Sequence, residues 1–312
     1  MDGTELLEIF CRRRDKYLEV AGVQAVSPID FSLRISPTGK EKDPPHLTIG
    51  VGVHGDEIQG VQALNQILDE SYDALANAQQ PVLFVVGNPE AVKLQRRYKD
   101  ADLNRQFSKG SIDATVYESK RAAELERAVQ GTRYLLDVHS TIAPTRKPYG
   151  IFPNRVDLVE FMHHLGTDIS DIILVDILSP EEGMCFDEHL YFTDPKCTPI
   201  TIEVGCLSDG QSAVDRARNA IYGALHYTGV IPGEVSLQQY PTLWEEAQKV
   251  PNSKDSSLVL DLVNFQPVEK GFVLGYKAET PITSEYDGII IFPRYNNSNV
   301  PTLVRIAVQK AS

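Results

Sequence analysis

The stretch VGVHGDEIQG, residues 51–60, joins two different sequence patterns. Before it, the small and β-branched residues of 47–53 have the length and hydrophobicity of a buried strand. After it, apolar residues recur with helical spacing over 58–68. Polar residues that follow a strand in an α/β unit lie where such proteins bind their ligands. We therefore expect His54 and Glu57, in the turn between strand and helix, to belong to a functional site.

Five further apolar runs have the length of strands. Their hydrophobicity is continuous rather than alternating, which is typical of strands that are covered on both faces. Between them lie segments whose apolar residues recur with a helical period, among them 114–130 and 211–227. The sequence therefore predicts an α/β fold, a three-layer αβα sandwich with a mixed sheet. The five runs span residues 81–88, 133–139, 149–153, 171–178 and 199–205.

The pattern changes toward the C-terminus. From about Ser256 onward, short apolar runs are separated by turn residues, and no long helical pattern lies between them. This pattern of short apolar runs and turn residues is typical of an all-β region. We therefore expect two domains, an α/β domain over residues 1–230 and a small all-β C-terminal domain over residues 231–312.

Composition restricts the kind of partner. The 312-residue chain has a formal net charge of -13 at pH 7, which disfavours nucleic acid and anionic membrane surfaces. No stretch approaches the ~18 apolar residues that a spanning helix needs. The four cysteines form no CxxC pair, which suits a reducing compartment. We expect a cytoplasmic, soluble protein that acts on a small solute, and a homo-oligomer is compatible with this sequence.

Three side chains at predicted strand ends have the chemistry of a catalytic zinc site. His54 and Glu57 are three residues apart and lie on one side of a helical turn, and His139 ends the run 133–139. A catalytic zinc ion takes three protein ligands and leaves its fourth position to water. Asp137 shares a strand face with His139 and is placed to orient it. The alternative is that these histidines only hydrogen-bond to their neighbours.

Two more stretches offer groups for a substrate. Residues 96–107, RRYKDADLNRQF, concentrate donors at Arg97, Asn104 and Arg105 in an otherwise acidic chain. Guanidinium groups bind carboxylates at two points. Glu203 ends an apolar strand, where burial raises a carboxyl pKa toward the range that suits proton transfer. The alternatives are a solvated loop and an ion pair between Glu203 and an arginine.

Four motifs, in this order and at these spacings, resemble those of the succinylglutamate desuccinylase/aspartoacylase family, a branch of the zinc carboxypeptidase-like hydrolases. They are GVHGDE, GNPEAVKLQRRYKDADLNRQF, LLDVHSTIAPTRKPYGIFP and TIEVG. The resemblance covers roughly residues 47–205, and the family also has a β-rich tail. It implies a zinc carboxypeptidase-like fold over the α/β domain.

The resemblance also implies roles for single residues. One zinc ion per chain is bound by His54, Glu57 and His139. Arg97 polarises the carbonyl of the bond to be cleaved, and Glu203 transfers the proton.

Further positions are implied to bind the substrate. The family pattern assigns the substrate carboxylate to Asn104 and Arg105. The segment after His139 is closer to the desuccinylase form, in which Arg146, or its neighbour Lys147, supplies an anion contact.

The activity that the resemblance implies is zinc-dependent hydrolysis of the amide bond of a small anionic N-acyl amino acid by metal-activated water. Aspartoacylases bind a second carboxylate with a tyrosine of the C-terminal domain, for which Tyr286 and Tyr295 are candidates. Two alternatives stay open: a carboxypeptidase-like hydrolase of a short peptide or modified amino acid, and a non-catalytic zinc-stabilised binding protein. The acyl group and the amine also stay open.

Overall fold

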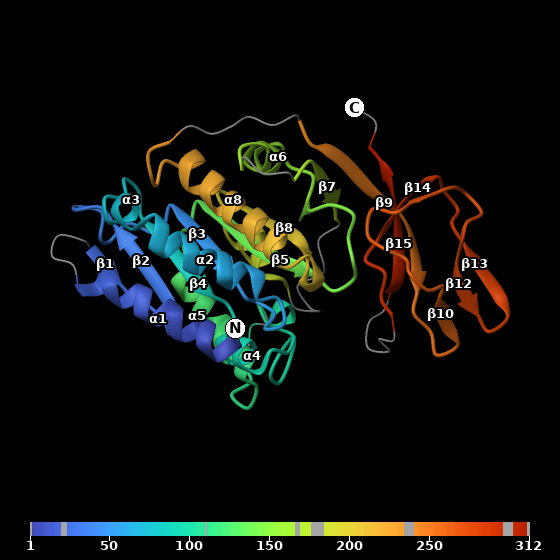
Figure 1. Cartoon of the computed structure of the whole chain (residues 1–312), viewed down its shortest axis with the longest axis horizontal. Coiled ribbons are helices and arrows are strands. Elements are labelled where there is room, and N and C mark those ends of the chain that lie inside the picture. The colour runs from blue at the N-terminus through green and yellow to red at the C-terminus, as the bar shows by residue number, and fades with distance from the viewer. Residues whose placement is uncertain are drawn as a thin grey trace.

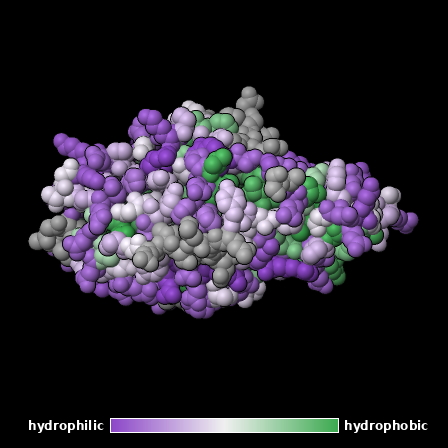
Figure 2. All heavy atoms as spheres, turned by 90° about the horizontal axis from the view of Figure 1, so that it is seen from above, coloured by the Kyte–Doolittle hydropathy of each residue, from purple (hydrophilic) through white to green (hydrophobic). Residues whose placement is uncertain are grey.

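A computed structural model shows a larger part that contains all the helices in Figure 1 and a smaller part made of strands beside it. Hydrophilic residues dominate the face seen in Figure 2, with small hydrophobic patches mainly toward the C-terminal part. The structure describes residues 2–19, 24–108, 110, 112–165, 169–175, 184–233, 240–295 and 302–310.

One twelve-stranded mixed sheet runs through both parts of the molecule. At its centre β3, β5 and β8 are parallel neighbours, whereas β6 pairs antiparallel with β8. The strands of the larger part, in sheet order, are β1 (Gln24–Val26), β2 (Ser32–Ser36), β4 (Val82–Val86), β3 (Leu47–Val51), β5 (Tyr134–Thr141), β8 (Thr198–Cys206), β6 (Tyr149–Phe152) and β7 (Asp171–Leu174).

In the larger part, helices cover both faces of this sheet, so that the prediction of a three-layer αβα sandwich is confirmed there. Side chains alternate between the faces along each strand. Ile49 and Leu136 belong to the core under one helix layer, whereas Val85 and Leu135 belong to the core under the other. Within the described ranges, no helix combines the length and the apolar character needed to cross a membrane.

The first layer is the larger of the two. It contains α1 (Gly3–Glu19), α2 (Gln59–Glu70), α3 (Tyr72–Ala76), α6 (Val156–His163) and α8 (Gln211–Tyr227). On the opposite face lie α5 (Tyr117–Ala128) and α7 (Phe186–Thr193), and the short α4 (Pro89–Leu94) follows β4.

The C-terminal part is all-β where it is described, as the sequence predicts. Its strand β9 pairs in parallel with β7, so the large sheet continues into this part. A second, three-stranded sheet packs beside it around a separate apolar core. The strands are β9 (Thr242–Pro251), β10 (Ser256–Leu258), β11 (Pro267–Val268), β12 (Val273–Lys277), β13 (Thr280–Thr283), β14 (Gly288–Ile291) and β15 (Thr302–Gln309).

Candidate active site

The carboxyl ends of the parallel strands β3, β5 and β8 bring the predicted site together. His54 and Glu57 lie in the turn after β3, and His139 lies near the end of β5. Glu203 is the direct β8 neighbour of His139 in the sheet register. The strand order places these four side chains at one edge although they are far apart in the sequence.

Glu57 lies between the two histidines. Its Oε1 is 2.8 Å from His54 Nδ1, and its Oε2 is 2.8 Å from His139 Nδ1. All three residues are buried, and their candidate ligand atoms lie within 4.8 Å of one another. Burial favours the neutral form of Glu57, but the two histidines outweigh it and hold the pKa of this carboxyl well below its usual range.

This donor set fits a zinc ion. Two imidazole nitrogens and one carboxylate are a ligand combination that catalytic zinc sites use. A further carboxylate holds the second nitrogen of each ring: Asp137 Oδ2 lies 2.9 Å from His139 Nε2, and Asp102 Oδ1 lies 3.2 Å from His54 Nε2. Such outer carboxylates fix the tautomer and the orientation of a ligating histidine. The sequence predicts this arrangement for Asp137, whereas only the structure reveals Asp102.

Arg97 adds a positive charge to the site. Its Nη1 is 3.6 Å from Glu57 Oε1, and its Nη2 is 3.1 Å from Asp102 Oδ2. The backbone holds this geometry, because Gly55 N donates to Arg97 O. Arg97 therefore lines the same cavity as the candidate metal ligands.

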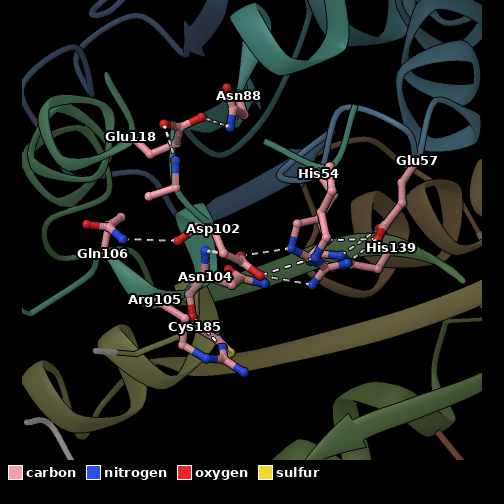
Figure 3. Close-up of polar contacts among 12 residues, drawn as sticks. His54, Glu57, Asn88, Asp102, Asn104, Arg105, Gln106, Glu118, His139 and Cys185 are labelled. Atoms are coloured by element: carbon pink, nitrogen blue, oxygen red, sulfur yellow. Dashed lines mark hydrogen bonds and ion pairs between the residues drawn. The ribbon is translucent and has the colours of Figure 1, made fainter. Parts of the chain in front are cut away.

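Asn104 and Arg105 lie in the same loop, one turn farther along (Figure 3). The Asn104 side chain accepts a hydrogen bond from Phe186 N, and Arg105 Nη1 contacts Cys185 Sγ at 3.3 Å. Neither of the two lines the cavity that Arg97 and Glu57 line. Both are thus near the site without facing its centre.

Arg146 is exposed and does not line the cavity. Its neighbour Lys147 forms an ion pair with Asp171 instead. The tyrosine candidates are also placed elsewhere, since Tyr295 donates its hydroxyl to Leu262 O and Tyr286 is 42% exposed.

Glu203 presents a free oxygen to the cavity. Its Oε2 is buried and has no hydrogen-bond partner among the described residues. Burial, and then the nearby Glu57, raise the pKa of Glu203 to about 7. A carboxyl group of that pKa can both take and return a proton near neutral pH.

Two cavity residues escape the sequence analysis, Tyr149 and Arg294. Tyr149 is the β6 neighbour of Glu203, and its buried hydroxyl has no partner among the described residues. Burial and Glu203 raise the pKa of Tyr149 well above its usual value, so the hydroxyl stays protonated. In the sequence, Tyr149 has the pattern of a core residue in an apolar strand, and no local feature distinguishes it from an ordinary core tyrosine.

Arg294 follows β14 and enters the cavity from the C-terminal part. Its side chain forms no ion pair within the part of the chain that the structure describes, although Glu203 attracts it electrostatically. Burial, and then Arg97, lower the pKa of Arg294, but a guanidinium remains charged in proteins. Arg294 lies three residues beyond β14 in a stretch of short strands, and no local pattern in the sequence distinguishes it.

Asn264 joins the two parts at the cavity wall. Its backbone N donates to Pro144 O, and its carbonyl accepts from Arg146 N. Its side chain oxygen accepts from Phe292 N, two residues before Arg294. The whole cavity has a volume of about 60 Å³. It is lined by His54, Glu57, Arg97, Ser140, Thr141, Ile142, Ala143, Tyr149, Glu203, Asn264, Phe292, Pro293 and Arg294.

The αβα sandwich with a His–Glu–His set at its strand ends defines a carboxypeptidase-like α/β protein. Residues 43–206 match the succinylglutamate desuccinylase/aspartoacylase catalytic domain. The chain belongs to this family, and the resemblance stated from its motifs is confirmed.

Individual relatives agree with this assignment. The succinylglutamate desuccinylase of Pseudoalteromonas atlantica is 25% identical over 301 residues, which cover 88% of this chain and 83% of that protein. The corresponding enzyme of Pseudomonas aeruginosa is 32% identical over 172 residues, 51% of each chain. The crystal structure of the Vibrio parahaemolyticus desuccinylase superposes with a TM-score of 0.74 at 19% identity, covering 95% of this chain and 94% of that chain.

Proposed function

We propose that this protein is a zinc-dependent hydrolase that cleaves the amide bond of a small anionic N-acyl amino acid. One observation carries the proposal: a buried His54–Glu57–His139 set shares a cavity with Arg97 and with the unpaired oxygen of Glu203. A metal site, a cation and a proton acceptor in one cavity are what amide hydrolysis by water requires.

Each residue has a distinct task in this reaction. His54, Glu57 and His139 hold zinc, which when bound lowers the pKa of its water toward neutrality. Glu203 accepts the proton of the attacking water at Oε2 and returns it to the departing amine nitrogen. Arg97 donates to the carbonyl oxygen as negative charge develops on it.

The substrate is anionic at both ends in this proposal. Asn104 and Arg105 bind the carboxylate of the amino acid, as the family pattern implies. Arg294 and the hydroxyl of Tyr149 bind an acyl group that ends in a carboxylate, because Arg294 has no anionic partner among the described residues. The names of the relatives, succinylglutamate desuccinylases, support a succinyl group.

The cavity argues against the two alternatives. Asn264 and Arg294 form its wall on the side of the C-terminal part, and the cation Arg294 suits a small anionic acyl group better than an uncharged peptide segment. A purely structural zinc site needs four protein ligands and no proton acceptor, whereas Glu203 is unpaired here.

The domain organisation follows the same division of tasks. We propose that residues 1–230 form the catalytic domain and that residues 231–312 form a β-rich domain that completes the acyl subsite. All four cysteines are free, in accord with our proposal that the protein works in the cytoplasm.

The deciding experiment measures metal and turnover together. Purified protein is analysed for metal by elemental analysis and assayed for amine release from N-acetyl, N-formyl and N-succinyl amino acids. We expect one zinc per chain and hydrolysis of the N-succinyl compounds. Glu203→Gln, the matched control, keeps the zinc and loses turnover about 10²- to 10⁴-fold. Zinc without turnover on any compound contradicts the proposed reaction, and protein without metal contradicts the proposed site.

A further inference from the structure

Glu118 is a buried carboxylate for which the proposed reaction has no use. It lies in the first turn of α5 and has no exposed surface. No lysine or arginine of the described ranges forms an ion pair with it. Burying a carboxylate away from water and from any cation costs free energy, unless hydrogen bonds from the protein replace those that water made.

Four N–H groups supply those hydrogen bonds. Oε1 accepts from Lys99 N at 2.7 Å and from Asn88 Nδ2 at 3.1 Å, and Oε2 accepts from Asp100 N and Ala101 N, both at 3.1 Å. Three successive backbone N–H groups that converge on one anion form a concave site of the kind called a nest. Figure 3 shows Glu118 beside Asn88, behind the loop that leads to Asp102.

The three amides bound by Glu118 lie between two residues of the active site. On one side is Arg97, whose guanidinium reaches Glu57, and on the other is Asp102, whose carboxylate reaches His54. The position of both side chains therefore depends on the backbone of residues 99–101. Asp102 also starts the turn that carries the two residues assigned to the substrate carboxylate.

The contact between helix and loop is reciprocal. Asp100 Oδ2 accepts from Tyr117 N at the start of α5, while Glu118 accepts from the loop. Asn88, which donates to Glu118, also accepts from Ala91 N at the start of α4. One carboxylate thus connects the loop with two helices.

We propose that Glu118 is a positioning residue that holds the loop of residues 97–105 in its substrate-binding geometry without touching the substrate. The assignment of Arg97, Asn104 and Arg105 to the substrate rests on the proposed function. The hydrogen bonds of Glu118 to the loop do not, so the two can be tested separately.

The first test is amide hydrogen exchange, which needs no turnover. Glu118→Gln replaces one acceptor oxygen by an NH₂ group, which faces N–H donors and cannot accept their hydrogen bonds. We therefore expect the backbone amides of residues 99–101 to exchange at least about tenfold faster than in the wild type. Zinc is still bound, because the candidate metal ligands lie on other segments, although with lower affinity where the loosened loop releases Asp102 from His54. Glu124→Gln is the matched control on the same helix, where the carboxylate is half-exposed and contacts Arg121. It leaves this exchange unaltered.

The second test is steady-state kinetics on an N-succinyl amino acid. A loosened loop raises KM about tenfold or more and lowers kcat as well, because Arg97 is displaced. Glu118→Asp, which keeps the charge with a shorter reach, recovers part of the loss. A merely structural role would lower only the active fraction, with KM unchanged, and that result contradicts the proposal.

Asp100→Asn covers the case in which Glu118→Gln does not fold. Asp100 is exposed, so its replacement removes one side of the reciprocal contact at little risk to the core. Faster exchange in the loop and a raised KM support the proposal, and unchanged values of both overturn it. If the wild-type protein cleaves no N-acyl amino acid, the proposed function fails, while the exchange data still decide whether Glu118 holds the loop.

Discussion

Glu203 and its cross-strand neighbour Tyr149 each present a buried oxygen without a hydrogen-bond partner among the described residues. Buried polar atoms are nearly always paired, so two unpaired ones in one cavity indicate a place for a ligand. The sequence predicts the first of them, because an acidic residue at the end of an apolar strand stands out. It misses the second, because a tyrosine in such a strand is an ordinary core residue.

The pH dependence of activity tests the role of Glu203. Its pKa is raised to about 7, and the group must be ionised to accept a proton. Below its pKa the carboxyl is protonated and cannot accept a proton, so kcat/KM rises as the pH increases through this pKa, which the positive charge of bound zinc brings below 7. The increase in kcat/KM is measured on the zinc-loaded enzyme between about pH 5 and about pH 8.5, so that the range includes pH values on both sides of the pKa. A flat profile over this range speaks against Glu203 as the base.

The proposed contact of Arg294 with the acyl carboxylate predicts a difference between acyl groups. Arg294→Gln removes the charge and keeps a hydrogen-bond donor, and a charged hydrogen bond contributes about 1.5–3 kcal/mol. We expect kcat/KM for an N-succinyl amino acid to fall about 10- to 100-fold, with a much smaller change for the N-acetyl analogue. Arg146→Gln is the matched variant, because the exposed Arg146 does not line the cavity. If kcat/KM for the N-succinyl amino acid falls in Arg146→Gln and not in Arg294→Gln, the acyl subsite is at Arg146.

At the scale of elements, the position of the turn after β3 depends on a close approach between its backbone and that of α4. A Cβ at Gly55 would lie 2.0 Å from Ala91 C and 2.1 Å from Ala91 O. Backbone cannot yield as a flexible side chain does, so only glycine allows this approach. The contact places His54 and Glu57 against the loop, since Gly55 N also donates to Arg97 O.

Gly55→Ala therefore separates the turn from α4. We expect a loss of about 1–3 kcal/mol in the free energy of unfolding and weaker zinc binding, measured by denaturation and by metal analysis. Gly60→Ala is the milder comparison, because its Cβ would meet its nearest atom at 3.3 Å, which a shift of a few tenths of an ångström relieves, and we expect a smaller loss there. Equal effects of the two substitutions would show that the close approach of Gly55 does not matter.

Several element boundaries follow from periodicity. The helical patterns at 114–130 and 211–227 appear as α5 and α8, whose amphipathic faces pack on the sheet. The predicted strand 171–178 appears as β7 up to Leu174, and its residues 176–178 lie outside the described part. The order of the strands in the sheet has no such local signal, because it depends on pairing between distant segments.

At the scale of the whole molecule, the proposed zinc ion would link two segments that the sheet brings side by side. His54 and Glu57 belong to the turn after β3, and His139 belongs to β5. A ligand that binds only the folded protein stabilises it in proportion to its saturation. We expect a chelator to lower Tm by about 5–10 °C in calorimetry. His139→Ala is the control, and a chelator effect that persists in this variant would place the metal elsewhere.

The C-terminal part completes the cavity because the large sheet continues through β9 into it. Asn264 and Arg294 line the same cavity as the candidate metal ligands His54 and Glu57. The sequence predicts an all-β region there but assigns it no side chain of the site, apart from two tyrosine candidates that lie elsewhere. The reason is that a β-rich tail of short strands contains no spacing that indicates which loop will face the other domain.

The sequence by itself determined the α/β class, the candidate zinc ligands and the candidate proton acceptor Glu203. These features depend on local periods and on the position of polar residues at strand ends, which can be read from neighbouring residues. Only the tertiary structure decided that Tyr149, Asn264 and Arg294 form the remaining wall of the cavity. These three residues come together only because of the order of the strands in the sheet and the junction between the two parts. Contacts between segments that are so far apart in the chain leave no local pattern in the sequence of those segments.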